Sequence, residues 1–309
     1  MKHTFYITAL LLGMFLFTQL VGIFVAHRYT PEIIQVIDAS GNVTNITSYN
    51  LPSWVEPPQD IKPHNVLIVI PIAIAIAVSL MFILMKYNAE ILLRLWFFAV
   101  VALALGITLN AFALSIQNSE IITLIIAIPI AYIKIFKRNI IVHNITELAI
   151  YPGIAAIFIP ILNLWTVILL LILISLYDMY AVWHAGFMQK MAKYQIQKLK
   201  VFSGFFVPYM GRRQKEKLAS LRKQNTKKNL EKKVKVSVAI LGGGDVVFPI
   251  ILAGVVLMTL GLMQAIIISL GATAALAGLF WLSKKGRFYP AMPFITAGCL
   301  VALGIAFLI

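Results

Sequence analysis

Two acidic residues of this chain, Asp178 and Asp245, lie deep inside apolar segments of membrane length. A carboxyl group at that depth costs several kcal/mol unless it is protonated, paired or hydrated, so it marks a functional site by default. Two carboxyl groups in one small site cannot both ionise easily, and one keeps a proton while the other is charged. Such a pair can take a proton from water and give another to a peptide carbonyl or a leaving amine. Acid–base hydrolysis of a peptide bond is therefore one chemistry that the two residues can perform.

The composition predicts that these residues belong to an integral membrane protein. Of all residues, 61% are apolar and 12% are charged, and the mean hydropathy is +0.92, far from the averages of soluble proteins. About nine apolar runs are long enough to cross a hydrocarbon core of about 30 Å. Because they lack the period-2 alternation of barrel strands, we expect an all-α polytopic fold. The expected spans are residues 5–26, 65–85, 91–114, 120–136, 140–160, 162–184, 235–258, 262–282 and 288–309.

The basic residues predict the orientation of these spans. With the amino terminus inside, all 26 Lys and Arg residues except Arg28 and Lys62 fall in segments on the inner side, in agreement with the positive-inside rule. We therefore expect a multi-pass protein of the cell membrane with a cytoplasmic amino terminus and an extracellular carboxyl terminus. The net charge of +15 is explained by this topology and by contact with anionic membrane lipids. We expect no nucleic-acid partner.

We divide the chain into three regions. Residues 1–184 hold the first six spans, residues 185–234 form a cytoplasmic basic loop, and residues 235–309 hold the last three spans. Within the loop, VFSGFFVPYMG is interpreted as an interfacial or re-entrant piece, and the basic stretch of residues 212–233 as a solvated helix or mobile tail. The single cysteine, Cys299, offers no disulfide framework and no thiol metal site. We expect neither a metal nor a cofactor.

The expected sixth and seventh spans can bring the two aspartates together. At 1.5 Å per residue, Asp178 lies roughly 9 Å from the inner end of its span, and Asp245 roughly 14 Å from the inner start of the next. These depths agree within the uncertainty of the span boundaries. We therefore expect the two carboxyl groups to face one another in the cytoplasmic half of the bilayer.

Glycine and proline residues accompany the aspartates. Three consecutive glycines, residues 242–244, directly precede Asp245 and are predicted to loosen the span and to admit water and an extended peptide. Pro249, four residues after Asp245, weakens the helix further. At the start of the ninth span, the prolines of residues 289–293 prevent a regular helix start and leave carbonyl groups without intrahelical partners.

In their order along the chain, these features resemble the motifs of the presenilin and signal peptide peptidase family of intramembrane aspartyl proteases. The matching residues are Tyr177-Asp178 for the YD motif, Gly242-Gly243-Gly244-Asp245 for GxGD, and Pro290-Ala291-Met292 for PAL. The resemblance covers most of the chain, including nine spans and a long loop between the sixth and the seventh. It implies that Asp178 and Asp245 are the catalytic dyad. It also implies that Tyr177, the three glycines and the Pro290 tripeptide border the substrate.

The resemblance also bears on substrates. Met292 stands where the family usually has Leu, and since this change conserves volume and apolarity, it concerns substrate preference more than activity. The compact chain is similar to microbial homologues. Its charge-derived orientation is that of presenilins, whereas signal peptide peptidases are inverted in the membrane. The implied substrates are membrane proteins with a single span whose amino terminus lies outside, and the oligomeric state is not indicated.

Other functions stay open on the residues alone. Paired membrane carboxylates also serve as proton or cation relays in channels and transporters, where glycine-broken helices line the binding site. The first five spans and the rest show no internal duplication that would favour this alternative. Prepilin peptidases also carry a GxGD aspartate, but the Pro290 motif and the nine spans argue against them. A zinc metalloprotease would need a His-Glu-x-x-His motif, which the chain lacks.

A third acidic residue, Glu147, lies at membrane depth in the fifth span. It shares a helix face with His143 at i, i+4, and we interpret the two as a polar contact near the membrane surface rather than as a zinc site. Glu147 itself is interpreted as a satisfied polar residue facing the bundle interior or a water-filled space, with a role along the substrate path as the alternative. In the eighth span, small residues predict close helix packing, either at Ser269, Thr273 and Ala277 or at Gly271 and Ala275.

Overall fold

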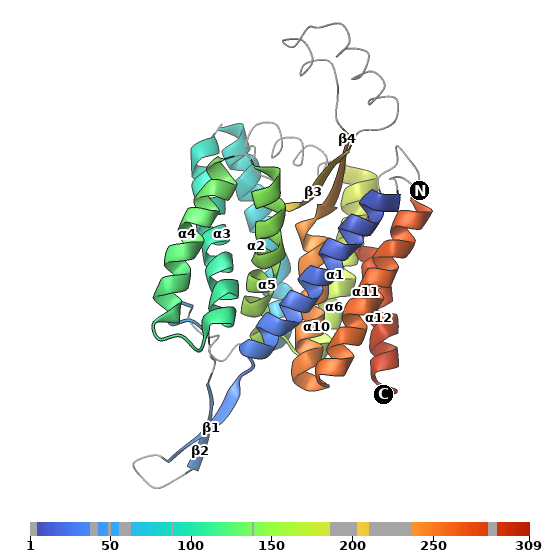
Figure 1. The fold of residues 1–309 in the computed structure, drawn as a ribbon. Helices are drawn as coiled ribbons and strands as arrows, with labels where there is room; N and C mark the ends of the chain where they lie inside the picture. The colour runs from blue at the N-terminus through green and yellow to red at the C-terminus, as the bar shows by residue number, and fades with distance from the viewer. Residues whose placement is uncertain are drawn as a thin grey trace, which may run out of the picture.

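The computed structural model describes residues 5–37, 43–48, 51–55, 63–87, 89–137, 139–185, 203–209, 237–283 and 289–309. Within these ranges the chain is a bundle of α-helices with two short β-hairpins (Figure 1). The basic stretch of residues 212–233, which we expected to be a helix or a mobile tail, lies outside the described residues.

Helices in the described ranges correspond to each of the predicted spans. They are α1 (Phe5–Arg28), α2 (Pro63–Lys86), α3 (Glu90–Ala113), α4 (Ser119–Phe136), α5 (Ile140–Phe158), α6 (Leu164–Tyr180), α10 (Gly243–Thr259), α11 (Leu262–Leu282) and α12 (Met292–Ala306). A 3-10 turn, Ile159–Ile161, follows α5, and a π-helical turn, Ala181–Ala185, follows α6. Seven of these helices are long and apolar enough to cross a membrane, and α10 and α12 are shorter apolar helices. The predicted all-α, multi-pass fold is confirmed.

Asparagine side chains cap two helices. Asn139 Oδ1 accepts hydrogen bonds from the backbone N–H groups of Ile141 and Val142 at 2.9 and 3.3 Å, and so starts α5. Asn163 Oδ1 accepts from Thr166 N at 2.8 Å at the start of α6. These bonds satisfy N–H groups that have no partner within a helix. The helices that carry Glu147 and Asp178 therefore begin at defined residues.

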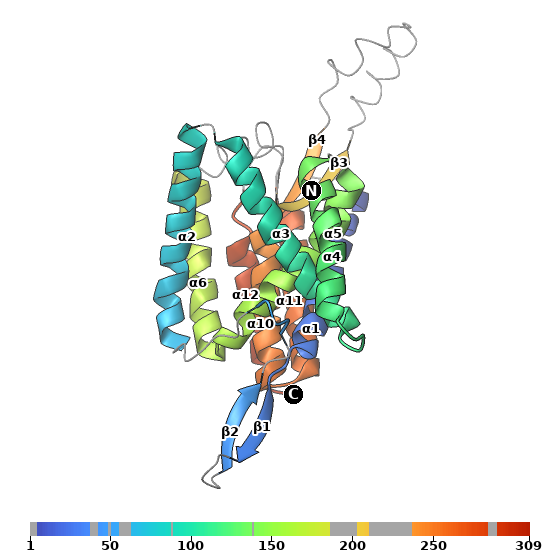
Figure 2. The ribbon, with the colours of Figure 1, turned by 90° about the vertical axis from the view of Figure 1, so that its left-hand side faces the viewer.

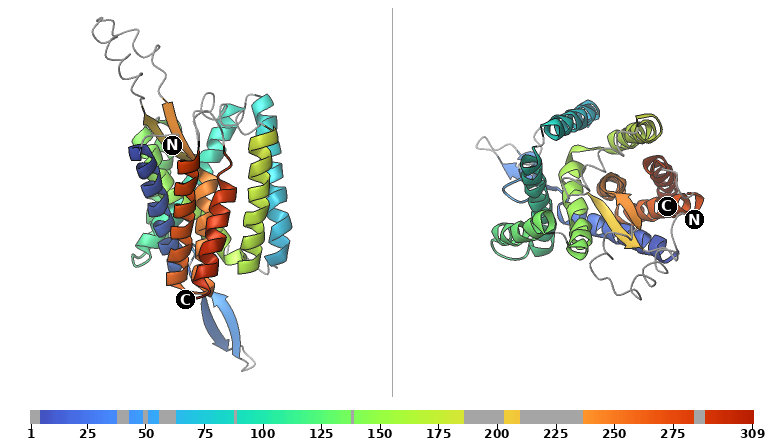
Figure 3. Two further views of the ribbon diagram at one scale, coloured as in Figure 1. Left: turned by 90° about the vertical axis from the view of Figure 1, so that its right-hand side faces the viewer. Right: turned by 90° about the horizontal axis from the view of Figure 1, so that it is seen from above.

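Helix α10 lies at the centre of the bundle, in contact with α1, α5, α6, α11 and α12 (Figure 3). Most of its side chains are buried, as expected for a helix that is apolar on all sides. Helix α2 lies at the edge of the bundle beside α6, which it contacts (Figure 2). Most of its described side chains are exposed, and in a bilayer they face lipid.

The two hairpins lie at opposite ends of the bundle (Figure 1). Strand β1 (Glu32–Ile37) pairs antiparallel with β2 (Val43–Ser48), at the end where the carboxyl terminus lies. Strand β3 (Gly204–Tyr209) pairs antiparallel with β4 (Ser237–Gly242), at the end where α1 begins. The termini therefore lie at opposite ends, as an odd number of spans requires.

The start of the expected seventh span is corrected by the structure. We expected one helix over residues 235–258, but residues 237–242 form β4 and the helix begins at Gly243. The side chains alternate along this segment, since Ala239 and Leu241 are buried while Ile240 is 43% exposed, which is the period of a strand. The described part of VFSGFFVPYMG, interpreted above as interfacial or re-entrant, is the partner strand β3.

Glycines allow the closest helix contacts. A Cβ atom at Gly271 in α11 would lie 2.4 Å from Ala302 Cβ in α12, and one at Gly298 in α12 would lie 2.4 Å from Ala275 Cβ. The predicted close packing at Gly271 and Ala275 is thus confirmed. Across α3 and α5, a Cβ atom at Gly153 would lie only 2.0 Å from the carbonyl oxygen of Ala104. Small residues at these points let the backbones approach and gain dispersion contacts in the absence of a hydrophobic drive.

Candidate active site

Asp178 lies in the last turn of α6, where its side chain meets the start of α12. The residue is 9% exposed, and its Oδ2 accepts a hydrogen bond from Met292 N at 3.2 Å. The backbone N–H of Ala291 also donates to this carboxyl group. The first N–H groups of a helix have no intrahelical partner and carry partial positive charge, so they suit a carboxylate. Two residues of the predicted Pro290-Ala291-Met292 motif therefore contact Asp178.

A second bond fixes the register of α6 against α12. Ser175 Oγ and Thr296 Oγ1 lie 2.7 Å apart, both in buried residues. Ser175 is one turn before Asp178 on α6, and Thr296 is one turn after Met292 on α12. The Asp178–Met292 and Ser175–Thr296 contacts thus join α6 to α12 at two points one helical turn apart.

This register bond leads to a stability prediction. The variant Thr296→Val keeps the shape of the side chain but leaves the Ser175 hydroxyl without its partner, so we expect a loss of about 0.5 to 1.5 kcal/mol in the free energy of unfolding. The double variant Ser175→Ala/Thr296→Val should recover part of that loss. Unfolding titrations in mixed micelles measure both losses, with Thr273→Val as control because the Thr273 hydroxyl donates within its own helix, to Ser269 O. Strictly additive losses would show that the two hydroxyls do not interact.

Asp245 lies in the first turn of α10, directly after the strand-to-helix transition. The N-cap residue is Gly242, and its backbone group hydrogen-bonds the Asp245 carboxyl group. Asp245 is at the third helical position, from which an acidic side chain can reach back toward the N-cap residue, and a Cβ atom at Gly242 would lie 3.1 Å from Asp245 Oδ2. The glycines that we expected to loosen a helix instead form its start. Pro249, inside α10, has no N–H, so the carbonyl of Asp245 lacks its usual intrahelical partner.

One side of α10 is open beside Asp245. In the first two turns of the helix, Gly244 is exposed and Asp245 and Phe248 are partly buried, whereas the other residues from Gly243 to Ile250 are buried. The three open residues share one helix face because they are spaced at i, i+1 and i+4. A group that approaches from this side reaches the carboxyl group next to a glycine backbone.

The two aspartates lie on helices that are in contact, α6 and α10. Their carboxyl groups are close enough for their charges to interact. Tyr177 precedes Asp178 on α6 and is 40% exposed. The fold therefore brings together the predicted aspartates with the start of α12.

The family described as "Signal-peptide peptidase, presenilin aspartyl protease" matches residues 21–309. The chain belongs to this family. It is an integral, multi-pass membrane protein and an aspartic endopeptidase of the presenilin type, which acts on transmembrane-helix substrates within the membrane. Family membership thus favours the protease over the channel or transporter that the residues alone left open.

Two solved structures support the presenilin-like fold. A presenilin family intramembrane aspartate protease in space group C222 has a TM-score of 0.61 and 18% identity, covering 97% of this chain and 98% of that chain. A structure of a presenilin family intramembrane aspartate protease in space group P2 has a TM-score of 0.60 and 18% sequence identity, and the match covers 96% of each chain. At this identity the likeness bears on the fold alone. No curated protein sequence matches the chain.

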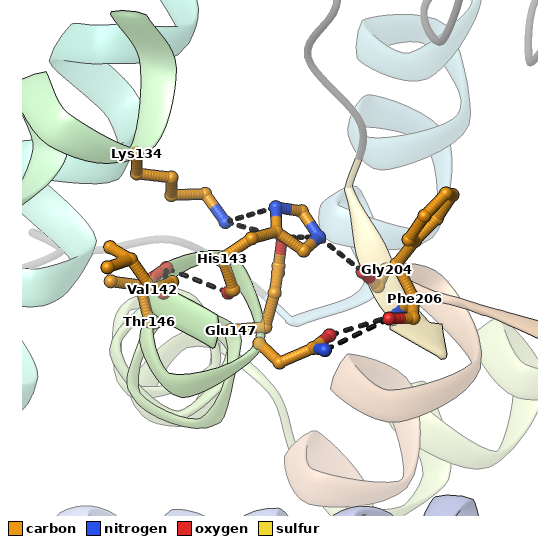
Figure 4. A network of polar contacts seen from close by, with 8 residues as sticks. Lys134, Val142, His143, Thr146, Glu147, Gly204 and Phe206 are labelled. Carbon is orange, nitrogen blue, oxygen red and sulfur yellow. Dashed lines mark hydrogen bonds and ion pairs between the residues drawn. The ribbon is translucent and has the colours of Figure 1, made fainter. Parts of the chain in front are cut away.

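Two buried polar side chains, those of Gln19 and Lys134, were not singled out from the sequence. Gln19 of α1 is fully buried, and its Nε2 donates to Val246 O at 3.0 Å, next to Asp245. Lys134 was grouped with the basic residues of the inner surface, yet its side chain is only 3% exposed and its Nζ lies 2.6 Å from Glu147 Oε1 (Figure 4). The available signal was its position within the apolar run before Lys137.

Glu147 and His143 form part of this polar cluster (Figure 4). His143 Nε2 lies 2.8 Å from Gly204 O and 3.6 Å from Glu147 Oε1. The interpretation of the pair as a polar contact is confirmed, and its partners are Lys134 and strand β3. Glu147 is 1% exposed and faces the bundle interior.

Proposed function

We propose that Asp178 and Asp245 are the catalytic dyad of this intramembrane protease. The observation that carries the proposal is that the two carboxyl groups come from helices in contact, α6 and α10, at positions where their charges interact. Two features add support. The backbone N–H of Met292, at the start of α12, donates to Asp178, and Asp245 directly follows the exposed Gly244.

In the proposed reaction the dyad begins with one charged and one protonated carboxyl group. The carboxylate takes a proton from a water molecule as the water oxygen bonds to the carbonyl carbon, and the other carboxyl group protonates the carbonyl oxygen. The resulting gem-diol then loses its C–N bond. The amine takes the proton held by the first carboxyl group, and a gem-diol hydroxyl returns a proton to the second. Each carboxyl group thus regains its starting state.

The substrate helix must open at the cleavage point, because a carbonyl within an intact helix is covered by its own hydrogen bond. We propose that the substrate enters laterally and unwinds beside Gly242, Gly243 and Gly244. Tyr177 on α6 and the Pro290-Ala291-Met292 segment would border it on the other side. The incomplete burial of Gly244 supports this arrangement, because it leaves backbone rather than side chain beside Asp245.

The orientation of the substrate follows from the distribution of basic residues. We propose that the protein lies in the cell membrane with its amino terminus in the cytoplasm and its carboxyl terminus outside. Its substrates would then be single-span proteins whose amino terminus lies outside. The unwound part of the substrate would pass the two aspartates in one fixed chain direction.

This proposal is tested with purified protein in liposomes and a single-span substrate inserted in either orientation. We expect cleavage of the substrate whose amino terminus lies on the side of the protein's carboxyl terminus, and at least about tenfold slower cleavage of the inverted one. A transition-state analogue of aspartyl proteases should block the reaction. Equal rates for both orientations would contradict the substrate assignment, and insensitivity to the analogue would contradict the dyad mechanism.

A further inference from the structure

Helix α5 presents a row of polar side chains to strand β3 and to the start of α10. His143, Glu147 and Tyr151 are spaced four residues apart and therefore share a face of the helix. Asn144 lies beside His143 on the first turns. Glu147 and Tyr151 are each 1% exposed.

A buried ion pair holds the His143 ring. Lys134 Nζ of α4 lies 2.6 Å from Glu147 Oε1 and 3.5 Å from His143 Nδ1. His143 Nε2 lies 2.8 Å from Gly204 O, a carbonyl that can only accept, so Nε2 carries the proton of this bond and Nδ1 can accept from Lys134. The ring is thus fixed at both nitrogens, between α4 and β3 (Figure 4).

Asn144 binds β3 as a neighbouring strand would. Its Nδ2 donates to Phe206 O at 3.0 Å, and its Oδ1 accepts from Phe206 N at 2.9 Å. Both backbone groups of Phe206 therefore point toward α5, and in an antiparallel ladder Gly204 points the same way because it lies two residues earlier. The edge of β3 away from β4 is thus held by α5 at two successive points.

The other edge of β3 leads to Asp245. Gly204 is opposite Gly242 in the β3–β4 register, and Phe206 is opposite Ile240. Gly242 is also the N-cap of α10 and the residue whose backbone contacts the Asp245 carboxyl group. His143 and Asn144 therefore connect to Asp245 through one strand pair and one turn.

Tyr151 adds a direct contact on the same helix face. Its ring packs edge-on against Phe205, with centroids 5.7 Å apart and planes at 84°. A Cβ atom at Gly243 would lie 2.8 Å from Tyr151 Cε1, so the ring lies directly against the first residue of α10. Helix α5 thus contacts both strand β3, which pairs with the strand before Asp245, and the first turn of α10.

We propose that His143, Asn144 and Glu147 are positioning residues for Asp245, which hold strand β3, and through it Gly242, in place beside the Asp245 carboxyl group. The inference rests on the proposed function, since it takes Asp245 as catalytic. A buried ion pair adds little stability compared with apolar residues of the same size, but it defines one geometry. A carboxyl group displaced by about 1 Å can lose about 100-fold in rate, so such geometry matters here.

The test compares kcat and KM for a single-span substrate in two matched pairs of variants. Asn144→Ala removes both bonds to Phe206, and its control Asn139→Ala removes the cap of the same helix without touching β3. Glu147→Gln removes the buried charge, and its control Glu90→Gln removes a charge from a half-exposed pair with Arg94. We expect kcat to fall about 10- to 100-fold in the first member of each pair, with KM changed less than about threefold. The controls should stay within about twofold of the unchanged protein.

A third variant separates positioning from simple stability. Lys134→Leu/Glu147→Leu removes both charges, so the thermal transition temperature should stay near that of the unchanged protein, yet the His143 ring loses its support and kcat should remain at least about tenfold reduced. If Glu147→Gln does not fold, the proposal is tested by this double variant and by Asn144→Ala with its control Asn139→Ala.

The inference would be overturned by a normal kcat in Asn144→Ala, or by an equal fall in kcat in Asn139→Ala. It would also be overturned if Lys134→Leu/Glu147→Leu had both the stability and the kcat of the unchanged protein. Asp245→Asn is measured in the same assay. If Asp245→Asn stays active, the proposed function fails. If it is inactive while Asn144→Ala and Glu147→Gln keep their kcat, only the positioning role fails.

Discussion

Replacing either Asp178 or Asp245 by Asn is expected to lower kcat for a reconstituted single-span substrate by at least about 1,000-fold, because the amide can neither take nor give a proton in the reaction. The double variant should be no slower than either single one, since the two groups act as a unit. Cleavage is measured in liposomes, with single-turnover conditions to separate binding from chemistry.

The fold of these variants should be preserved. An Asn side chain at residue 178 keeps an oxygen that can accept the hydrogen bond from Met292 N, and one at residue 245 can still accept from Gly242. The thermal transition temperature and KM should therefore change little, and Glu90→Gln serves as the control for loss of a carboxylate elsewhere. Near-full activity of either Asn variant would show that the dyad is wrongly assigned.

Gly153→Ala is expected to destabilise the fold by about 3 kcal/mol or more, because the added methyl group would lie 2.0 Å from Ala104 O and 2.9 Å from Thr108 Oγ1. Neither neighbour is the free end of a flexible side chain, since Thr108 Oγ1 donates to Ala149 O at 2.6 Å. Helices α3 and α5 must therefore separate. The free energy of unfolding in mixed micelles measures this loss.

The matched control is Gly278→Ala in α11, where an added Cβ meets no atom within 4 Å. There the change should be neutral or stabilise by up to about 1 kcal/mol, as alanine favours a helix over glycine. Because α5 also carries Asn144 and Glu147, Gly153→Ala should lower kcat as well. Equal stability of the two variants would mean that α3 and α5 pack less closely at Gly153 than described.

Hydropathy was enough to predict the helical bundle, because in a bilayer each spanning backbone must satisfy its own hydrogen bonds. It was not enough to place the start of α10. Residues 237–242 are a short apolar run, and such a run fits a buried strand as well as a helix. The strand forms because β3, from a distant part of the chain, pairs with it. The sequence of residues 237–242 alone does not identify that partner.

Some polar residues of the site could be predicted from the sequence, whereas others could be found only in the structure. Asp178 and Asp245 could be found from the sequence because isolated charge in an apolar span is costly wherever it lies. The position of Lys134 within an apolar run sets it apart from Lys137, but its partner could not be found from the sequence, since Glu147 is on another helix. Asn144, Ser175 and Gln19 carry no charge, so nothing in their local sequence distinguishes them.

By itself, the sequence determined which segments are apolar enough to be helices and which acidic residues they contain, because these depend on composition and local hydrogen bonding. Only the tertiary structure decided that the start of α12 contacts Asp178, that a strand pair leads into Asp245, and that α5 holds this strand. Those contacts join residues far apart in the chain, and their free energy comes from pairing backbone and side-chain groups that only the packed bundle brings within reach.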